Sequence, residues 1–176
     1  MDTTKTEEQF KRVMDECRTL FAKKLHDYGA SWRILRPSSL TDQLFIKAKR
    51  IRSLEITGTS LVGEGIRPEF IALINYGIIG LIQLEKGYVD TVDTKPEEAL
   101  ALYDAHAKEC LELMLRKNHD YNEAWRDMRI SSYTDFILTK IQRIKEIEGL
   151  DGKTLVSEGI YSIYMDIFNY ACFRAI

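Results

Sequence analysis

Two lysines occupy positions where an amphipathic helix should carry apolar side chains. Lys140 falls inside the isoleucine stripe of residues 137–147, and Lys47 holds the same place in an earlier helical segment. Arg50 and Arg143 flank the two stripes. An ammonium group turned toward a core needs an anion or a carboxylate beside it, unless it snorkels to solvent at the helix edge. The pattern therefore leaves two interpretations open, an anion-binding lysine and a lysine at the bundle edge.

A polar stripe near the end of the chain could supply the acidic partner. Glu158, Asp166 and Asn169 lie within one arc of a helical segment whose other faces are apolar, although a solvent-facing edge would give the same pattern. An asparagine, Asn75, recurs at the equivalent position in the first half of the chain, whereas Asp166 aligns with Ala72. A buried amide ties helices together through hydrogen bonds unless a ligand takes over those bonds.

Carboxylates in this stripe could hold Mg²⁺, which prefers oxygen ligands and substrate phosphates. Glu158 and Asn169 lie too far apart along one helix to share a metal ion, so other helices would have to contribute ligands. Glu109 and Glu112 form a carboxylate pair at i, i+3 spacing that could do so. An exposed charged turn is the alternative interpretation of that pair.

The most specific short string is His-Asp-Tyr followed by tryptophan four residues later, at 26–32 and again at 119–125. A flat aromatic side chain beside a basic residue suits a nucleobase and its phosphates. Alternatively, the aspartates cap backbone N–H groups or pair with Arg50 and Arg143, while the aromatic rings close the core. The candidate ligand-binding residues of the two strings are Asp27, Trp32, Asp120, Tyr121 and Trp125.

The chain repeats itself, so each candidate residue has an internal comparator. The string HDYGASWRILRPSSLTD aligns without a gap with HDYNEAWRDMRISSYTD, and KAKRIRSLE aligns with KIQRIKEIE. One residue is added near Asp151, after which LVGEGI aligns with LVSEGI. We expect two repeats, residues 1–90 and 91–176, merged into one structural domain.

Each repeat reads as three helices. Capping boxes at Thr6 with Gln9 and at residues 94–97 predict the starts of the first helices. A polar loop with the His-Asp-Tyr string should follow, and the second helices should begin near Thr41 and Thr134. The third helices are almost wholly apolar and should be central. The prediction is an all-α fold, two tandem three-helix repeats packed as one pseudo-twofold six-helix bundle.

The amino-acid composition argues against some functional classes, namely broad nucleic-acid binding and membrane insertion. The 176 residues are 45% hydrophobic and 30% charged with a net charge of −2, which argues against broad nucleic-acid binding. No apolar run reaches the length of about 20 residues that a membrane span needs, and the N-terminus has no apolar leader segment. We expect a cytoplasmic protein with no membrane partner. Its three cysteines should be reduced and lie in the core. A homo-oligomer is possible.

The combination of HDYGASW, KAKRIRSLE and EGIRPEFIALINYG, repeated as HDYNEAW, KIQRIKEIE and EGIYSIYMDIFNYA, resembles the family called nucleotide modification associated domain, first type. This former domain of unknown function occurs in bacteria and phages. The resemblance implies an association with nucleotide or modified-base metabolism. The family pattern falls on Lys117, Asp120, Tyr121, Trp125, Lys140, Arg143, Glu158, Asp166, Asn169 and Tyr170, and on Lys24, Asp27, Tyr28, Trp32, Lys47, Arg50, Glu64, Asn75 and Tyr76.

A weaker similarity links the last helix to MazG-like all-α nucleotide pyrophosphatases, in which acids of an ExxD helix bind Mg²⁺ and a water attacks the phosphate chain. The second repeat has Ile163 in place of the glutamate and keeps Asp166, whereas the first repeat has Glu69 and Ala72. Each repeat thus keeps one acid of the pair.

The leading hypothesis is a protein that binds a small nucleotide, with Mg²⁺-dependent pyrophosphohydrolysis as its reaction. Lys140 and Asp166 would be catalytic, and Glu109, Glu112, Glu158 and Asp166 would be metal ligands. Asp120, Tyr121, Trp125, Arg143 and Asn169 would bind the ligand, as would Asp27, Trp32, Lys47, Arg50 and Asn75. The second repeat should hold the more complete site. The alternative is a non-catalytic helical module that binds a nucleotide or a protein.

Overall fold

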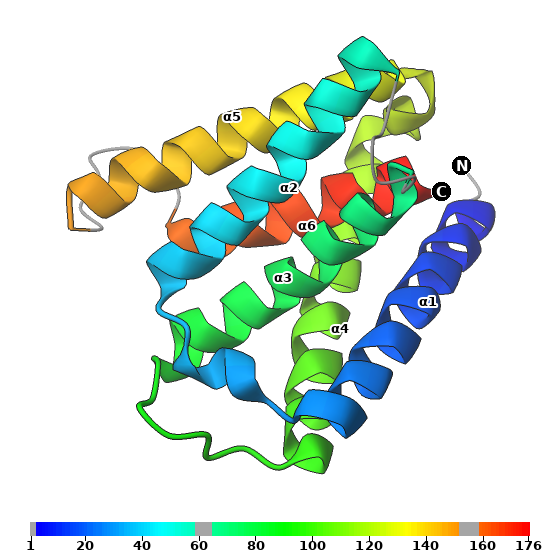
Figure 1. Cartoon of the computed structure of the whole chain (residues 1–176). Helices are drawn as coiled ribbons and strands as arrows, with labels where there is room; N and C mark the ends of the chain where they lie inside the picture. Colours follow the sequence, from blue (N-terminus) through cyan, green and yellow to red (C-terminus); the bar gives the residue numbers. More distant parts are fainter. Residues whose placement is uncertain (1–2, 59–64, 152–158) are drawn as a thin grey trace.

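The computed structural model describes residues 3–58, 65–151 and 159–176. Over these ranges the chain forms six α-helices, two short 3₁₀ helices and no strand, which confirms the all-α prediction (Figure 1). The first repeat contains α1 (Thr4–Tyr28), η1 (Ser31–Ile34), α2 (Pro37–Thr57) and α3 (Arg67–Lys86). The second repeat contains α4 (Pro96–Tyr121), η2 (Ala124–Asp127), α5 (Ile130–Gly149) and α6 (Ile160–Ala175).

The predicted starts of three helices are wrong by a few residues. The helices α2 and α5 begin at Pro37 and Ile130, so Thr41 and Thr134 lie one turn inside the helices and are buried. Proline fits the first helical position because its ring sets the helical φ angle in advance, and this favours the early start of α2. Thr6 lies within α1 and donates to Glu123 at 2.5 Å, so it caps no helix.

The predicted polar loop is also wrong at its start, because the His-Asp-Tyr strings form the last turns of α1 and α4. No helix-breaking residue precedes Gly29 or Asn122, which end the two helices with φ angles of 68° and 57°. The shorter loops that remain carry the tryptophans on η1 and η2. The aspartates therefore project from helix ends.

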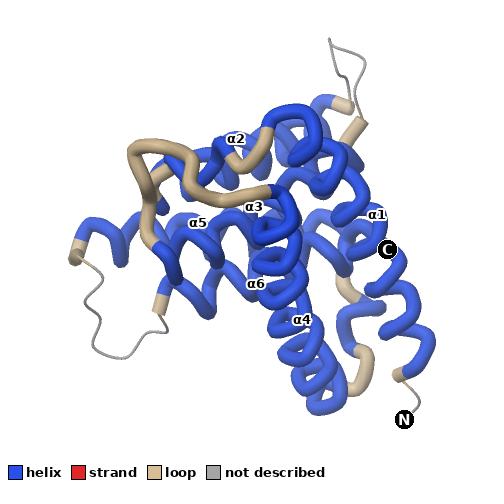
Figure 2. Tube along the Cα trace, turned by 90° about the horizontal axis from the view of Figure 1, so that it is seen from below, coloured by secondary structure: helices blue, strands red, loops and turns tan. Residues whose placement is uncertain are grey.

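The helices pack as three layers of two, and each layer pairs equivalent helices of the two repeats. The central pair is α3 with α6, while α2 and α5 cover one side and α1 and α4 the other. Figure 2 shows helices and loops and no strand over the described ranges. The buried apolar side chains of both repeats form one continuous core. None of the helices in the described ranges is both long and apolar enough to cross a membrane.

Reciprocal contacts between α2 and α5 reveal the relation between the repeats. Thr41 at the start of α2 donates to Glu148 at the end of α5, over 3.0 Å. Thr134 at the start of α5 donates in the same way to Glu55 at the end of α2. Thr41 is equivalent to Thr134, and Glu55 is equivalent to Glu148. An antiparallel pairing of α2 and α5 with twofold symmetry therefore produces both bonds. The hydroxyls expected to cap helices instead join the repeats.

The central helices approach closely at Gly80, where the ring of Tyr164 packs against α3. A Cβ atom at this position would lie 2.2 Å from Cε1 of Tyr164, whose side chain is fully buried. Gly80 therefore stands in a helix interior for a steric reason, although glycine weakens a helix relative to alanine. The hydroxyl of Tyr164 lies 2.9 Å from that of Thr41, so the same ring also links α6 to α2.

We predict that Gly80→Ala destabilises the protein by roughly 1–3 kcal/mol, because the added methyl group overpacks the α3–α6 contact. The melting temperature should fall by about 2–4 °C for each kcal/mol in a chain of this size. Thermal unfolding followed by circular dichroism measures the change. Gly149→Ala is the control, since nothing lies within 4 Å of a Cβ at that exposed helical position. Equal melting temperatures for the two variants would contradict this account.

The three cysteines are free and buried, as the sequence analysis predicts. Burial raises the pKa of Cys17 to about 12, and burial likewise raises the pKa values of Cys110 and Cys172. The thiolate is the reactive form, so these groups should be inert in the folded chain.

We therefore expect an aromatic disulfide reagent to modify none of the three thiols rapidly in the native protein. All three should react at once in a denaturant such as guanidinium chloride, because unfolding exposes them and restores ordinary pKa values. The absorbance of the released thiolate counts the modified groups. Fast modification of one thiol under native conditions would show that its burial is incomplete.

Candidate functional site

The twofold arrangement creates two equivalent hollows, one in each repeat. The first pocket lies between α1, η1, α2 and α3 and has a volume of about 760 Å³. The second pocket lies between α4, η2, α5 and α6 and has a volume of about 260 Å³. The polar and aromatic residues that line the first pocket are Phe21, Lys24, Tyr28, Ser31, Trp32, Lys47, Glu69, Asn75 and Tyr76. Those that line the second are Lys117, Asn118, Tyr121, Trp125, Tyr133, Asp166, Asn169, Tyr170 and Phe173.

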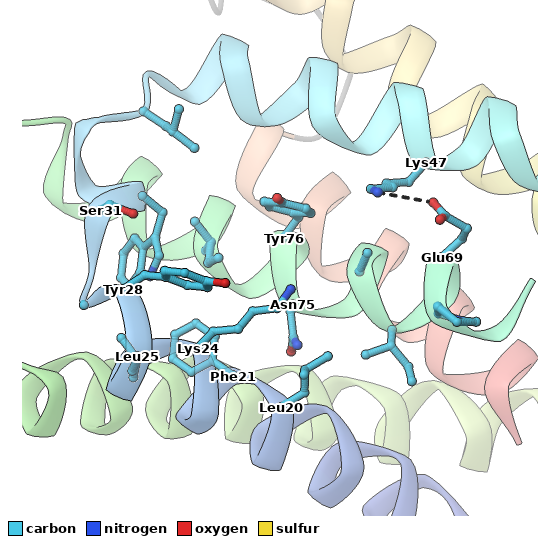
Figure 3. A pocket seen from close by; sticks show the side chains of 17 residues that line it. Leu20, Phe21, Lys24, Leu25, Tyr28, Ser31, Lys47, Glu69, Asn75 and Tyr76 are labelled. Atoms are coloured by element: carbon cyan, nitrogen blue, oxygen red, sulfur yellow. Dashed lines mark ion pairs between the residues drawn. The ribbon is translucent and has the colours of Figure 1, made fainter. Parts of the chain in front are cut away.

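A buried carboxylate organises the charged side of the first pocket. Glu69, only 3% exposed, lies on the first turn of α3 and faces α2. Its Oε2 atom lies 3.5 Å from Lys47 Nζ (Figure 3), and its Oε1 atom accepts a hydrogen bond from Arg50. The inward lysine of α2 thus has an acidic partner. Glu69 was absent from the predicted site, although its place in an apolar helix opposite two cations is a readable signal.

Lys24 supplies the second ammonium group of the first pocket. Its side chain reaches from α1 toward Asn75, and Tyr28 and Tyr76 lie on the same side of the pocket (Figure 3). Among the described residues, no carboxylate forms an ion pair with Lys24. The pocket therefore combines an exposed ammonium group with aromatic side chains, of which Tyr28 is mostly exposed at the rim.

Trp32 is positioned by the neighbouring Arg33, which is buried although it is charged. Arg33 Nη1 donates to the carbonyl oxygen of Gly87 at 2.6 Å and also to Gln83, and its Nε lies 3.2 Å from Asp93. These bonds tie η1 to the end of α3 and to the segment between the repeats. The Trp32 ring then packs against Phe21, with ring centroids 6.1 Å apart. The equivalent Arg126 of the second repeat makes different contacts.

The two asparagines of the repeats differ in their bonding. Asn75 donates to the carbonyl oxygen of Cys17 at 3.1 Å and accepts from the Tyr103 hydroxyl at 2.8 Å, so it ties α3 to α1 and α4. Asn169 is equally buried, but no described residue donates to its Oδ1 atom. The repeat relation explains the difference, because Phe10 is the equivalent of Tyr103 and has no hydroxyl.

Asp166 dominates the charge of the second pocket. Its carboxylate lies 2.8 Å from Lys117 Nζ and 3.2 Å from Lys140 Nζ, and the residue is only 7% exposed. Lys140 therefore turns inward to a carboxylate, as one of the two interpretations of the lysine stripe requires. Arg143 is exposed and does not line the second pocket. The structure thus joins Lys140 and Asp166 and leaves Arg143 apart.

The aromatic ring of Trp125 in the second pocket already packs against other side chains of the protein. The Trp125 ring stacks on Phe173 with centroids 4.6 Å apart, and the Arg126 guanidinium lies 4.4 Å from the same ring. Tyr133 donates to the Trp125 carbonyl oxygen, and burial raises the pKa of that tyrosine to about 12, so it remains a donor. Tyr121 is mostly exposed at the pocket rim.

The aspartates of the His-Asp-Tyr strings lie outside both pockets. Asp27 and Asp120 are exposed, and each lies 3.2 Å from Nδ1 of the histidine that precedes it. The alternative in which they pair with Arg50 and Arg143 is wrong for Asp27, because Arg50 binds Glu69 across the α2–α3 contact. A helix end directs both carboxylates away from the interior.

The predicted Mg²⁺ ligands do not come together in the described residues. Glu109 accepts from the Tyr161 hydroxyl at 2.8 Å and lies 3.3 Å from His106 Nδ1, while Glu112 is exposed. Glu158 falls outside the described ranges. No group of three acidic, histidine or cysteine side chains suited to a metal ion exists in those ranges. Within the described ranges Asp166 contacts two lysines instead, so Glu109, Glu112 and Asp166 form no group suited to Mg²⁺ there.

Comparison with known proteins adds one match. The family model described as nucleotide modification associated domain 1 matches residues 24–84 and 117–176, one stretch in each repeat. Both stretches begin at the pocket lysine of the first helix and extend into the third helix. Neither a curated protein nor a solved structure matches the chain. The matched regions contain most of the residues that line the two pockets.

We predict that Glu69→Gln lowers the free energy of unfolding by roughly 1–3 kcal/mol, because it leaves two cations beside a neutral buried amide. Urea unfolding measures the loss. Glu16→Gln is the matched control, since it breaks the half-exposed Glu16–Arg67 pair, whose contribution should stay below about 1 kcal/mol. If both variants lower the free energy of unfolding by the same amount, the Glu69 carboxylate does not stabilise the fold through its buried contacts with the two cations.

Proposed function

The chain belongs to the nucleotide modification associated domain 1 family, and we propose that it is a module that binds a small nucleotide in its first pocket. The family description associates such domains with nucleotide modification. The first pocket has the side chains that a nucleotide requires, cations for phosphate and aromatic rings for a base. The proposal concerns binding and assigns no reaction.

The observation that carries the proposal is a cavity of about 760 Å³ with an available lysine. Sites for small molecules commonly span about 300–1,000 Å³ and combine apolar walls with a few polar groups. Leu25, Leu35 and Ile79 contribute apolar surface beside Lys24. A cavity of this size and composition can enclose a nucleoside and one or more phosphates.

Each group of the first pocket has a distinct role in this proposal. Lys24 and Lys47 attract the phosphate, because an ammonium group forms strong charge-assisted hydrogen bonds with phosphate oxygens. Tyr28 and Tyr76 offer ring faces to the base, and stacking of this kind tolerates different bases. Trp32 extends the aromatic wall from η1.

The geometry favours binding over pyrophosphate hydrolysis. Hydrolysis of the expected kind needs several carboxylates around Mg²⁺, whereas Asp166 faces two lysines and Glu69 faces Lys47 and Arg50. A carboxylate neutralised by cations attracts a metal ion weakly. Pyrophosphate release from nucleoside triphosphates in the presence of Mg²⁺, lost in Asp166→Asn, would contradict the binding module.

We predict that Lys24→Ala weakens nucleotide binding roughly tenfold or more, which corresponds to about 1.4 kcal/mol. Isothermal titration calorimetry with the common 5′-mononucleotides and nucleoside triphosphates measures the affinity. Lys23→Ala is the matched control, because it removes the same charge from the adjacent residue of α1, which does not line the first pocket. Equal affinities of both variants would place the ligand elsewhere, and no binding to the unaltered chain would refute the proposal.

A further inference from the structure

The two repeats hold the same pair of lysines and differ in what those lysines face. Lys24 and Lys47 both line the first pocket, whereas Lys117 lines the second pocket and Lys140 does not. In the second repeat, Lys117 and Lys140 bracket the carboxylate of Asp166 at 2.8 and 3.2 Å. Their equivalents in the first repeat are Lys24 and Lys47, and the residue aligned with Asp166 is Ala72. A methyl group therefore stands where the second repeat has an anion.

Glu69 replaces the missing carboxylate only in part. It lies one helical turn before Ala72, and one of its oxygens accepts from Arg50. Its other oxygen is 3.5 Å from Lys47 and has no hydrogen bond within the described residues. Glu69 does not neutralise the charge of Lys24, because no ion pair joins the two side chains. The first pocket thus keeps one cation without an acidic partner, at the place where the second repeat holds a complete three-membered ion cluster.

We propose that a phosphate of the ligand takes, in the first pocket, the place that the Asp166 carboxylate holds in the second. This inference rests on the proposed nucleotide binding and specifies its position. The phosphate lies over Ala72 and contacts Lys24 and Lys47 as Asp166 contacts Lys117 and Lys140. The second pocket is closed to such a ligand by its own side chain, so each chain binds one nucleotide.

The volumes of the pockets agree with this assignment. The second pocket measures about 260 Å³ against about 760 Å³ for the first. Asp166 and Phe173 fill space where the first repeat has Ala72 and Ile79, and Phe173 is fixed by its stacking on Trp125. The second repeat therefore has a carboxylate and an aromatic ring at two positions where the first repeat has the smaller side chains of Ala72 and Ile79.

Exchange of the two residues tests the inference. Ala72→Asp should weaken mononucleotide binding at least tenfold, because its carboxylate occupies the phosphate position. Asp166→Ala should retain the first site and gain a second site for inorganic phosphate, measured by ³¹P NMR titration. The double variant Ala72→Asp with Asp166→Ala should bind phosphate in the second repeat alone. Circular dichroism verifies folding, and Glu69→Ile with Ala72→Asp reproduces the residues of the second repeat if the single variant fails to fold.

The outcomes separate this inference from the proposed function. Mononucleotide binding that Ala72→Asp leaves unchanged, or two equivalents bound by the unaltered chain, would overturn the inference and leave nucleotide binding intact. An unaltered chain that binds no mononucleotide would refute the proposed function. In that case the phosphate titration still tests whether Asp166 occupies a phosphate position. A phosphate site gained in Asp166→Ala supports this role of Asp166, and the absence of such a site overturns it.

Discussion

Burial of a single carboxylate on each central helix constrains the whole bundle. Glu69 on α3 and Asp166 on α6 are both more than nine-tenths buried, so each requires a cation from a neighbouring helix. Lys47 and Arg50 of α2 meet this need in the first repeat, and Lys117 of α4 with Lys140 of α5 meets it in the second. These pairs fix how the outer helices lie against α3 and α6.

The repeat relation determines how the two units fit together. Each layer contains equivalent helices, and the reciprocal bonds of Thr41 with Glu148 and of Thr134 with Glu55 set α2 antiparallel to α5. The close approach of α3 and α6 then depends on the absence of a side chain at Gly80 opposite Tyr164. A chain built from two similar units thus uses a few asymmetric residues to fill its shared core.

Two differences between the repeats affect the pockets, although most polar and aromatic residues there are the same in both. The acid moves by one helical turn, from Glu69 in α3 to the position of Asp166 in α6. The tyrosine that satisfies Asn75 has no counterpart at Asn169, where Phe10 stands. The two pockets differ accordingly: the first measures about 760 Å³ and its Glu69 pairs with Lys47, whereas the second measures about 260 Å³ and its Asp166 pairs with both Lys117 and Lys140.

The amino-acid sequence by itself determined the repeat, the all-α fold and the central apolar helices, because these follow from periodicity along one chain. It placed Lys47 and Lys140 within apolar stripes and left open whether they meet an acidic partner or reach solvent at the helix edge. It also identified the tryptophans and asparagines near the pockets. It placed the starts of α2 and α5 four residues late, since the hydroxyls of Thr41 and Thr134 serve the contact between repeats. Only the tertiary structure decided which acid neutralises which lysine, that Arg143 and the two exposed aspartates lie apart, and that the larger pocket is in the first repeat. The physical reason is that helical spacing fixes the face on which a side chain lies, whereas an ion pair of about 3 Å depends on the offset and rotation of two packed helices.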